Sequence, residues 1–172
     1  MEPIGYNVKS QSEAEIDLEV EETGTTFREN AELKARAIYN IKHTAVLADD
    51  SGIEIDYLNG EPGIYSARYM GLSSDEERLN YVLQKLEGVE GSKRNARFVC
   101  CICYIDSEGN AKFAEGYWYG KIAKEARGDN GFGYDPIFIP EGESITSSEM
   151  APEEKNKKSH RARALEKLLE IL

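Results

Sequence analysis

The chain of 172 residues contains few of the residue types on which several kinds of protein depend. It has only two histidines, and neither lies in a pattern typical of a Ser–His or Cys–His nucleophile, so no catalytic triad is visible. The longest apolar run, residues 98–105, is far shorter than the roughly 20 residues of a membrane span. The first residues lack a signal-peptide pattern. We therefore expect a cytoplasmic protein that has no membrane partner.

Basic residues are also scarce. The chain has 21 Lys and Arg and 32 Asp and Glu residues, which gives a formal net charge of −11. Proteins that bind DNA or RNA polymers use Lys and Arg to neutralise phosphates, so a nucleic acid polymer is not an expected partner. A small polyanion that binds in a locally basic, metal-assisted cleft remains compatible with this charge.

The three cysteines, Cys100, Cys101 and Cys103, lie together in the longest apolar run. Adjacent or alternating strand positions have poor geometry for a disulfide, and a structural zinc site usually has four ligands at wider spacing. The sequence therefore predicts buried, reduced thiols.

The pattern of elements favours one α/β domain over residues 1–172, because there is no repeat and no linker-like segment. Thr26 and Glu29 form a capping pattern before an apolar helical stripe that includes Phe27 and Ala31. Two strands are expected at residues 44–48 and 53–58, so that the carboxylates between them lie at a strand end.

Further along the chain, Ser74 is a second capping residue, for a helix that runs to about residue 86. Residues 97–105 and 111–122 read as an antiparallel hairpin at the centre of a mixed sheet. A last helix is expected over residues 159–172. The fold predicted is α/β, with a mixed central sheet flanked by helices and a nucleotide cleft between two lobes.

Three groups of residues could carry chemistry. The first is Asp49, Asp50 and Ser51, together with an acidic run that ends at Glu22. Hard oxygen ligands in small numbers suit Mg²⁺, which is usually completed by water and substrate phosphates. The alternative is that these are turn and capping residues.

The second group is the glycine-rich loop that contains Phe132, Gly133, Tyr134 and Asp135. An aromatic ring there could stack on a base, and the carboxylate could accept hydrogen bonds from a nucleoside. The alternative is a tight loop whose aromatic side chains fill the core.

The third group is a basic island in an acidic chain. Lys155 and Arg161 flank a helix start, and this combination suits an anion or a carbonyl oxygen. The alternative is a solvated turn in which Ser159 caps the helix and His160 is structural.

Five segments occur together in a recognisable order: residues 22–31, 47–52, 63–69, 131–138 and 159–165. Together they resemble the inosine triphosphate pyrophosphatase family, the XTP/dITP diphosphatases. The resemblance implies an ITPase-like fold, a homodimer and Mg²⁺. It also implies hydrolysis of ITP, dITP and XTP to the nucleoside monophosphate and pyrophosphate, which cleanses the nucleotide pool.

The resemblance also implies roles for single residues. Asp50 is similar to the family's proton acceptor and metal ligand, and Glu22 to its second metal carboxylate. The segments that resemble substrate contacts contribute Ser51, Phe132, Gly133, Tyr134, Asp135, Lys155, His160 and Arg161. Arg161 has only donors, so it suits the 6-keto oxygen of hypoxanthine or xanthine and disfavours the amino group of adenine.

The chain departs from the family pattern at its start. Residues 4–9 match the family's second strand, and nothing in this sequence matches the opening strand or its lysine-containing phosphate-binding turn. We therefore expect an N-terminally truncated member. One alternative is a weakly active or inactive nucleotide-binding protomer, and another is a pyrophosphatase for modified pyrimidine nucleotides.

Overall fold

The computed structural model describes residue 5 and residues 7–172. The helices and strands are α1 (Phe27–Lys42), β1 (Val46–Ile55), α2 (Asp75–Lys85), β2 (Asn95–Ile105), β3 (Ala111–Ile122), β4 (Phe138–Pro140), α3 (Pro152–Lys158) and α4 (His160–Ile171). Short 3₁₀ segments are η2 (Asp56–Leu58), η3 (Gly63–Gly71), η4 (Gly91–Arg94) and η5 (Asp135–Ile137). Of the strand expected at residues 4–9, residues 4 and 6 lie outside the described part, and residues 7–9 have no regular structure.

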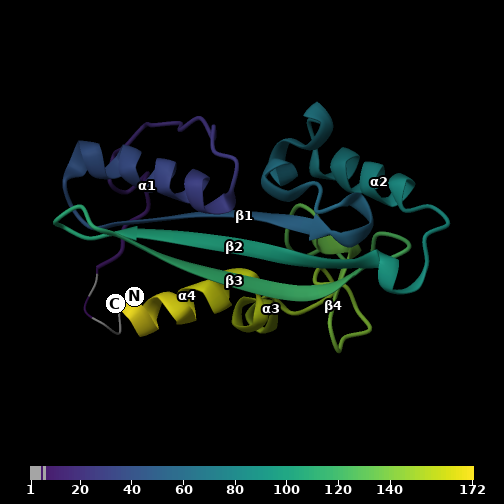
Figure 1. Cartoon of the computed structure of the whole chain (residues 1–172). Helices are drawn as coiled ribbons and strands as arrows, with labels where there is room; N and C mark the ends of the chain where they lie inside the picture. Colours follow the sequence, from purple (N-terminus) through teal and green to yellow (C-terminus); the bar gives the residue numbers. More distant parts are fainter. Residues whose placement is uncertain (1–4, 6) are drawn as a thin grey trace.

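Four strands form one sheet in the order β1-β2-β3-β4, and helices cover both of its faces (Figure 1). The α/β architecture is confirmed, as is the β2–β3 hairpin at its centre. All described pairs are antiparallel, unlike the mixed pairing that the sequence suggested. The reason is the connection through η3, α2 and η4, which begins β2 where β1 has ended, whereas a parallel pair needs a crossover to the opposite end.

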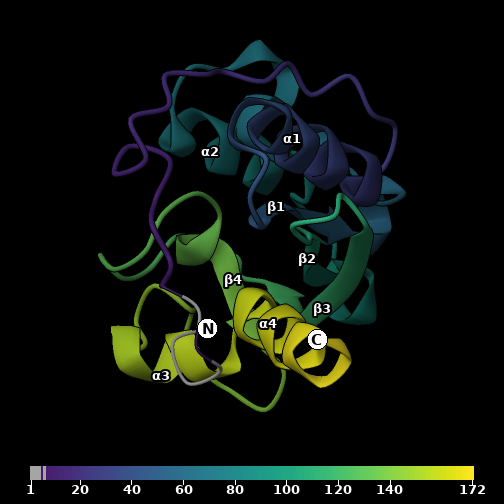
Figure 2. The ribbon, with the colours of Figure 1, turned by 90° about the vertical axis from the view of Figure 1, so that its left-hand side faces the viewer.

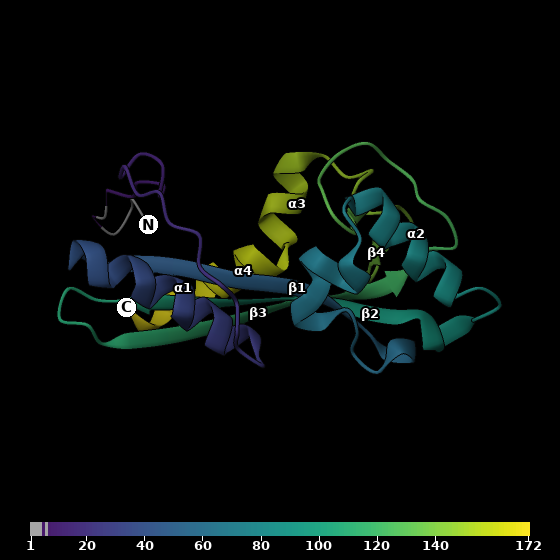
Figure 3. The same cartoon turned by 90° about the horizontal axis from the view of Figure 1, so that it is seen from above.

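Two layers of helix enclose the sheet. Helix α1 lies above β1 and β2 and α4 lies below β2 and β3, as the end-on view in Figure 2 makes clear. Along β1, α1 lies at one end and η3 with α2 lies at the other, as seen from above in Figure 3. No helix in the described residues combines the length and apolar character needed to cross a membrane.

Helix starts follow the capping residues that the sequence indicated. Thr26 Oγ1 accepts a hydrogen bond from Glu29 N at 3.1 Å, although the Glu29 carboxylate bonds Thr25 rather than Thr26. Ser74 and Glu77 form a full capping box at α2. On α1, Phe27, Ala31 and Ala35 are buried against the sheet. These local signals are therefore sufficient to place both helices.

The expected break between two strands at residues 49–52 is wrong. β1 runs through this segment, with Asp49 opposite Ile102 and Gly52 opposite Val99 on β2. Gly52 is required by packing rather than by a turn, since a Cβ there would lie 2.3 Å from the Gly63 carbonyl oxygen. β1 then ends at Ile55, and residues 56–58 form η2 instead of more strand.

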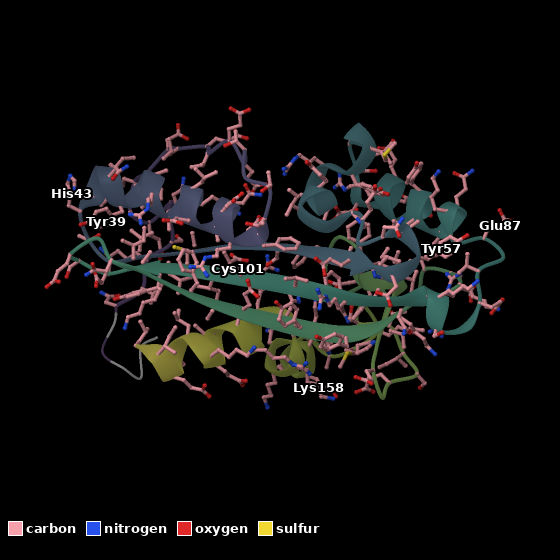
Figure 4. The ribbon with its side chains drawn as sticks, viewed as in Figure 1. Tyr39, His43, Tyr57, Glu87, Cys101 and Lys158 are labelled. Atoms are coloured by element: carbon pink, nitrogen blue, oxygen red, sulfur yellow. The ribbon has the colours of Figure 1, made fainter. Side chains whose placement is uncertain are left out.

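The three cysteines are free and fully buried, as expected. Cys101 and Cys103 face α1, as the position of Cys101 in Figure 4 illustrates, and Cys100 faces α4. Burial raises the pKa of the Cys100 and Cys101 thiols to about 12 and that of Cys103 to about 11. Because the thiolate is the reactive form, these groups should be inert in the folded protein.

We therefore expect the folded protein to react negligibly with a thiol reagent such as dithionitrobenzoate at pH 8, whereas all three thiols should react in denaturant. Counting released thionitrobenzoate under both conditions measures this directly. Rapid modification of any of the three thiols without denaturant would contradict their burial.

Candidate active site

Asp50 lies at the centre of an acidic and basic cluster on the α1 side of the sheet. Its side chain is nearly buried, at 6% exposure, and Oδ1 accepts a hydrogen bond from Lys34 Nζ at 2.9 Å. Oδ2 lies 3.4 Å from Nδ2 of the fully buried Asn30. Asn30 and Lys34 are one turn apart on α1, so this helix presents both side chains to the strand.

Glu22 belongs to the same cluster. Lys34 Nζ also donates to Glu22 Oε1 at 3.0 Å, and Arg68 Nη1 of η3 donates to Glu22 Oε2 at 2.6 Å. The two carboxylates selected from the sequence therefore converge on a single ammonium group. Sequence reasoning missed Lys34 and gave Arg68 no role. The signals that could have found them are the i, i+4 spacing from Asn30 and the segment of residues 63–69.

The surroundings shift the pKa values of the two carboxylates in opposite directions. Burial raises the pKa of Asp50 above its ordinary value, and hydrogen bonding and attraction from Lys34 oppose that shift without cancelling it. Burial also acts on Glu22, but hydrogen bonds from Lys34 and Arg68 outweigh it and lower the pKa of Glu22. Asp50 is thus the carboxylate of the pair that is better suited to accept a proton.

A divalent metal fits this donor set. Mg²⁺ binds one or two carboxylates and completes its shell with water and phosphate oxygens. Glu22 and Asp50 come from different segments and already share one cation, Lys34, at a common point. In the described residues no group of three or more His, Cys, Asp or Glu side chains gathers as a metal cluster. Glu22 and Asp50 are therefore the carboxylates that would hold the metal, with water and substrate oxygens in its shell.

Asp49 and Ser51 lie on the opposite face of β1 from Asp50, because successive strand residues alternate. Asp49 Oδ2 accepts hydrogen bonds from Ser51 Oγ at 2.9 Å and from Arg161 Nε at 3.1 Å. Burial opposes ionisation of Asp49, but Arg161 and Ser51 hold its pKa below the usual range. Asp49 and Asp50 lie within β1 rather than at a strand end as predicted, and Asp49 anchors Arg161 to the sheet.

The glycine-rich loop separates its two aromatic residues. Phe132 is 64% exposed, and its ring centroid lies 5.0 Å from Lys155 Nζ and 5.6 Å from Arg161 Cζ. Tyr134 is buried and donates a hydrogen bond to the Ser66 carbonyl at 2.8 Å. Phe132 is therefore available for stacking, whereas Tyr134 fills the core, as in the alternative interpretation.

Asp135 holds the glycine-rich loop in shape from within. It is buried, and its carboxylate accepts hydrogen bonds from Phe132 N at 2.9 Å, from Ser147 Oγ at 2.9 Å and from Lys155 Nζ. Gly133 N donates to Asp75 Oδ2 of α2 at 2.7 Å. In this structure the polar groups of Asp135 and Gly133 organise the loop and place Phe132 beside two cations.

His160 is the first residue of α4 and is buried against the sheet. Its ring stacks on Phe98 with centroids 4.9 Å apart, and burial lowers its pKa to about 3. Nδ1 of this neutral ring has no hydrogen-bond partner in the described part of the chain. Ser159 caps α4 by accepting a hydrogen bond from Ala162 N, as in the alternative interpretation, but residues 152–158 form α3 rather than a charged turn.

A hollow of about 1080 Å³ reaches this region of the sheet. Its lining includes Lys34, Lys42 and Asp49, together with residues 44–48 along the edge of β1. This volume slightly exceeds the range typical of small-molecule sites, which is roughly 300–1,000 Å³. Lys34 and Asp49 therefore adjoin this hollow, whereas Glu22, Asp50 and Arg161 do not line it.

Comparison with known proteins identifies the protein family. Residues 1–171 match the Ham1 family. The chain belongs to the Ham1 family. It is 48% identical over 173 residues to the dITP/XTP pyrophosphatase of Bacillus subtilis, which covers 100% of this chain and 87% of that relative. It is 51% identical over 172 residues to the dITP/XTP pyrophosphatase of Thioalkalivibrio sulfidiphilus, at 98% and 87% coverage.

Solved structures of Ham1 proteins have the same fold. The HAM1 protein of Coxiella burnetii and the Ham1 protein of Staphylococcus aureus each superpose with a TM-score of 0.83 at 44% identity. Each match covers 90% of this chain and 80% of the other chain. The resemblance that the five sequence segments carried is thereby confirmed.

In this Ham1 protein, hydrogen bonds join the five segments around β1. Residues 22–31 reach residues 47–52 through Asn30 and Asp50, and reach residues 63–69 through Glu22 and Arg68. Tyr134 of the glycine-rich loop bonds Ser66, and Arg161 of α4 bonds Asp49. Segments that are far apart in the sequence thus form one connected site.

Proposed function

We propose that this chain hydrolyses dITP, ITP and XTP to the nucleoside monophosphate and pyrophosphate, with residues 1–172 acting as one catalytic domain. The observation that carries the proposal is the convergence of Glu22 and Asp50 on one cationic point, Lys34 Nζ. Relatives at 48% and 51% identity are named dITP/XTP pyrophosphatases, which supports the same reaction here.

Asp50 is the proposed proton acceptor for the attacking water. Its low exposure and raised pKa favour proton uptake compared with Glu22, whose carboxylate two cations keep ionised. Asn30 and Lys34 fix the orientation of the Asp50 carboxylate. Mg²⁺ held by Glu22 and Asp50 would supply positive charge against the phosphates and the departing pyrophosphate.

The purine is proposed to lie against Phe132, between the cations of Lys155 and Arg161. The 64% exposure of this ring supports stacking, and Asp135 and Asp75 stabilise the backbone that carries it. Arg161 offers donors and no acceptor, so it suits a 6-keto oxygen and meets the 6-amino group of adenine donor to donor. Once a bound base covers Phe132 and Arg161, such a mismatch should discriminate by about 10²-fold.

Ser51 and His160 complete the proposed substrate-binding set on the α4 side of β1. Gly133 and Asp135 contribute by shaping the loop that presents Phe132, and Tyr134 anchors that loop from the core. We further propose a cytoplasmic homodimer that binds neither nucleic acid polymers nor membranes. The excess of acidic residues supports the exclusion of nucleic acid polymers.

The direct test is pyrophosphate release from dITP, ITP, XTP, ATP, GTP and UTP by purified protein with Mg²⁺, repeated after addition of EDTA. We expect turnover of dITP, ITP and XTP. The rate with ATP should be lower by about 10²-fold, and EDTA should abolish all turnover. Absence of turnover by the folded chain, or a preference for UTP, would refute the proposal.

A further inference from the structure

Arg68 is the one cation of the acidic cluster that comes from the η3 side of the site. Its Nη1 donates to Glu22 Oε2 at 2.6 Å, and this is its only hydrogen bond within the described residues. The side chain is 41% exposed, and Cζ lies 5.2 Å from the ring centroid of the exposed Tyr65. The guanidinium therefore keeps most of its five donors free at the mouth of the cluster.

The segment that carries Arg68 is fixed to the strand that carries Asp50. Ser66 Oγ accepts a hydrogen bond from Ile53 N at 2.9 Å and donates to the Gly63 carbonyl at 2.6 Å. Gly52 permits this approach, since a Cβ there would lie 2.6 Å from Ser66 Oγ. Arg68 is thus held at a set position relative to Asp50 rather than on a free loop.

The charges of the cluster are balanced before substrate arrives. Glu22 and Asp50 carry two formal negative charges when ionised, and Lys34 and Arg68 carry two positive charges. A triphosphate would add several negative charges and needs new donors. Arginine is the side chain whose planar fork best matches phosphate oxygens, often with two parallel hydrogen bonds.

We propose that Arg68 leaves Glu22 when substrate binds and donates instead to the oxygens of its triphosphate. Glu22 holds the guanidinium ready in the unliganded protein, and release of Arg68 frees one Glu22 oxygen. This inference rests on the proposed function for its substrate. It assigns phosphate binding to residues 63–69, a role that the proposed catalytic and base-binding groups do not fill.

The test is calorimetric titration of the wild-type protein, Arg68→Ala and Arg68→Lys with inorganic tripolyphosphate in EDTA. Loss of a charge-assisted contact predicts affinity weakened by about 10- to 100-fold in Arg68→Ala. Arg68→Lys should be intermediate, because lysine keeps the charge and loses the fork.

The chain offers a matched control. Arg97 is 40% exposed, pairs with Glu54 at 2.7 Å and lies with Cζ 4.8 Å from the Tyr117 ring centroid, so its surroundings closely resemble those of Arg68 away from the cluster. Arg97→Ala should bind tripolyphosphate as the wild type does. Titration with dIMP should show a smaller difference between wild type and Arg68→Ala, because dIMP carries only one of the three phosphates.

The outcomes separate this proposal from the proposed function, since the titration involves neither metal nor turnover. Wild-type binding that is lost in Arg68→Ala supports the assignment even if dITP is not hydrolysed. Equal tripolyphosphate affinity in wild type and Arg68→Ala, an equal loss in Arg97→Ala, or no wild-type binding would overturn it. If Arg68 only positioned Glu22, binding in EDTA would be unchanged and kcat alone would fall.

Discussion

Replacing Asp50 with asparagine is expected to lower kcat for dITP by about 10³-fold, because the change removes the proton acceptor and one of two metal carboxylates. The amide preserves the shape of the side chain, so Asn30 and β1 should keep their places. Steady-state pyrophosphate release measures the effect. Binding of dIMP should remain close to wild type, since Phe132 and Arg161 lie on the other side of the strand.

The appropriate control is Asp56→Asn, an equal change of charge at an exposed position in η2. This variant should keep wild-type kcat and KM. An Asp50→Asn protein that retained more than about a tenth of wild-type turnover would refute the assignment of Asp50 as general base, since such groups contribute about 10²–10⁴-fold.

The parts of the fold that the sequence could predict are those with local causes. Thr26 and Ser74 satisfy backbone donors within one helical turn, and the β2–β3 hairpin brings together strands that are adjacent in the chain. The burial of the cysteines follows from their position in an apolar run. None of these features requires knowledge of a distant segment.

The features that the sequence could not place depend on distant partners. Gly52 is a residue type typical of turns, but here its lack of a side chain makes room for η3, which packs against it from residue 63 onward. In the sequence, Lys34 is indistinguishable from an ordinary helical lysine. Only the structure shows that it pairs with Asp50 and Glu22. Tyr134 and Phe132 are near neighbours in one loop, yet it is packing of Tyr134 in the core and its hydrogen bond to Ser66, far upstream, that bury one ring and not the other. Tertiary contacts therefore determined the site more than local propensity.

Gly116→Ala is expected to be the most destabilising of the small substitutions considered, because β3 and α4 are in contact there through backbone atoms. A Cβ at residue 116 would lie 2.1 Å from the His160 carbonyl oxygen and 2.4 Å from Ala164 N, and neither atom can rotate away. Displacement of α4 should lower the free energy of unfolding by about 3 kcal/mol, as overpacking of a tight core does.

The same displacement would move Arg161, whose Nε lies 3.1 Å from Asp49 Oδ2, so KM for dITP should rise as stability falls. Urea denaturation should give a lower midpoint with an unchanged slope. Glu115→Ala, at the exposed neighbouring position of β3, should stay within about 0.5 kcal/mol of wild type. If Gly116→Ala were as stable as this control, α4 would not be seated on β3 through Gly116, and the placement of His160 and Arg161 would need another cause.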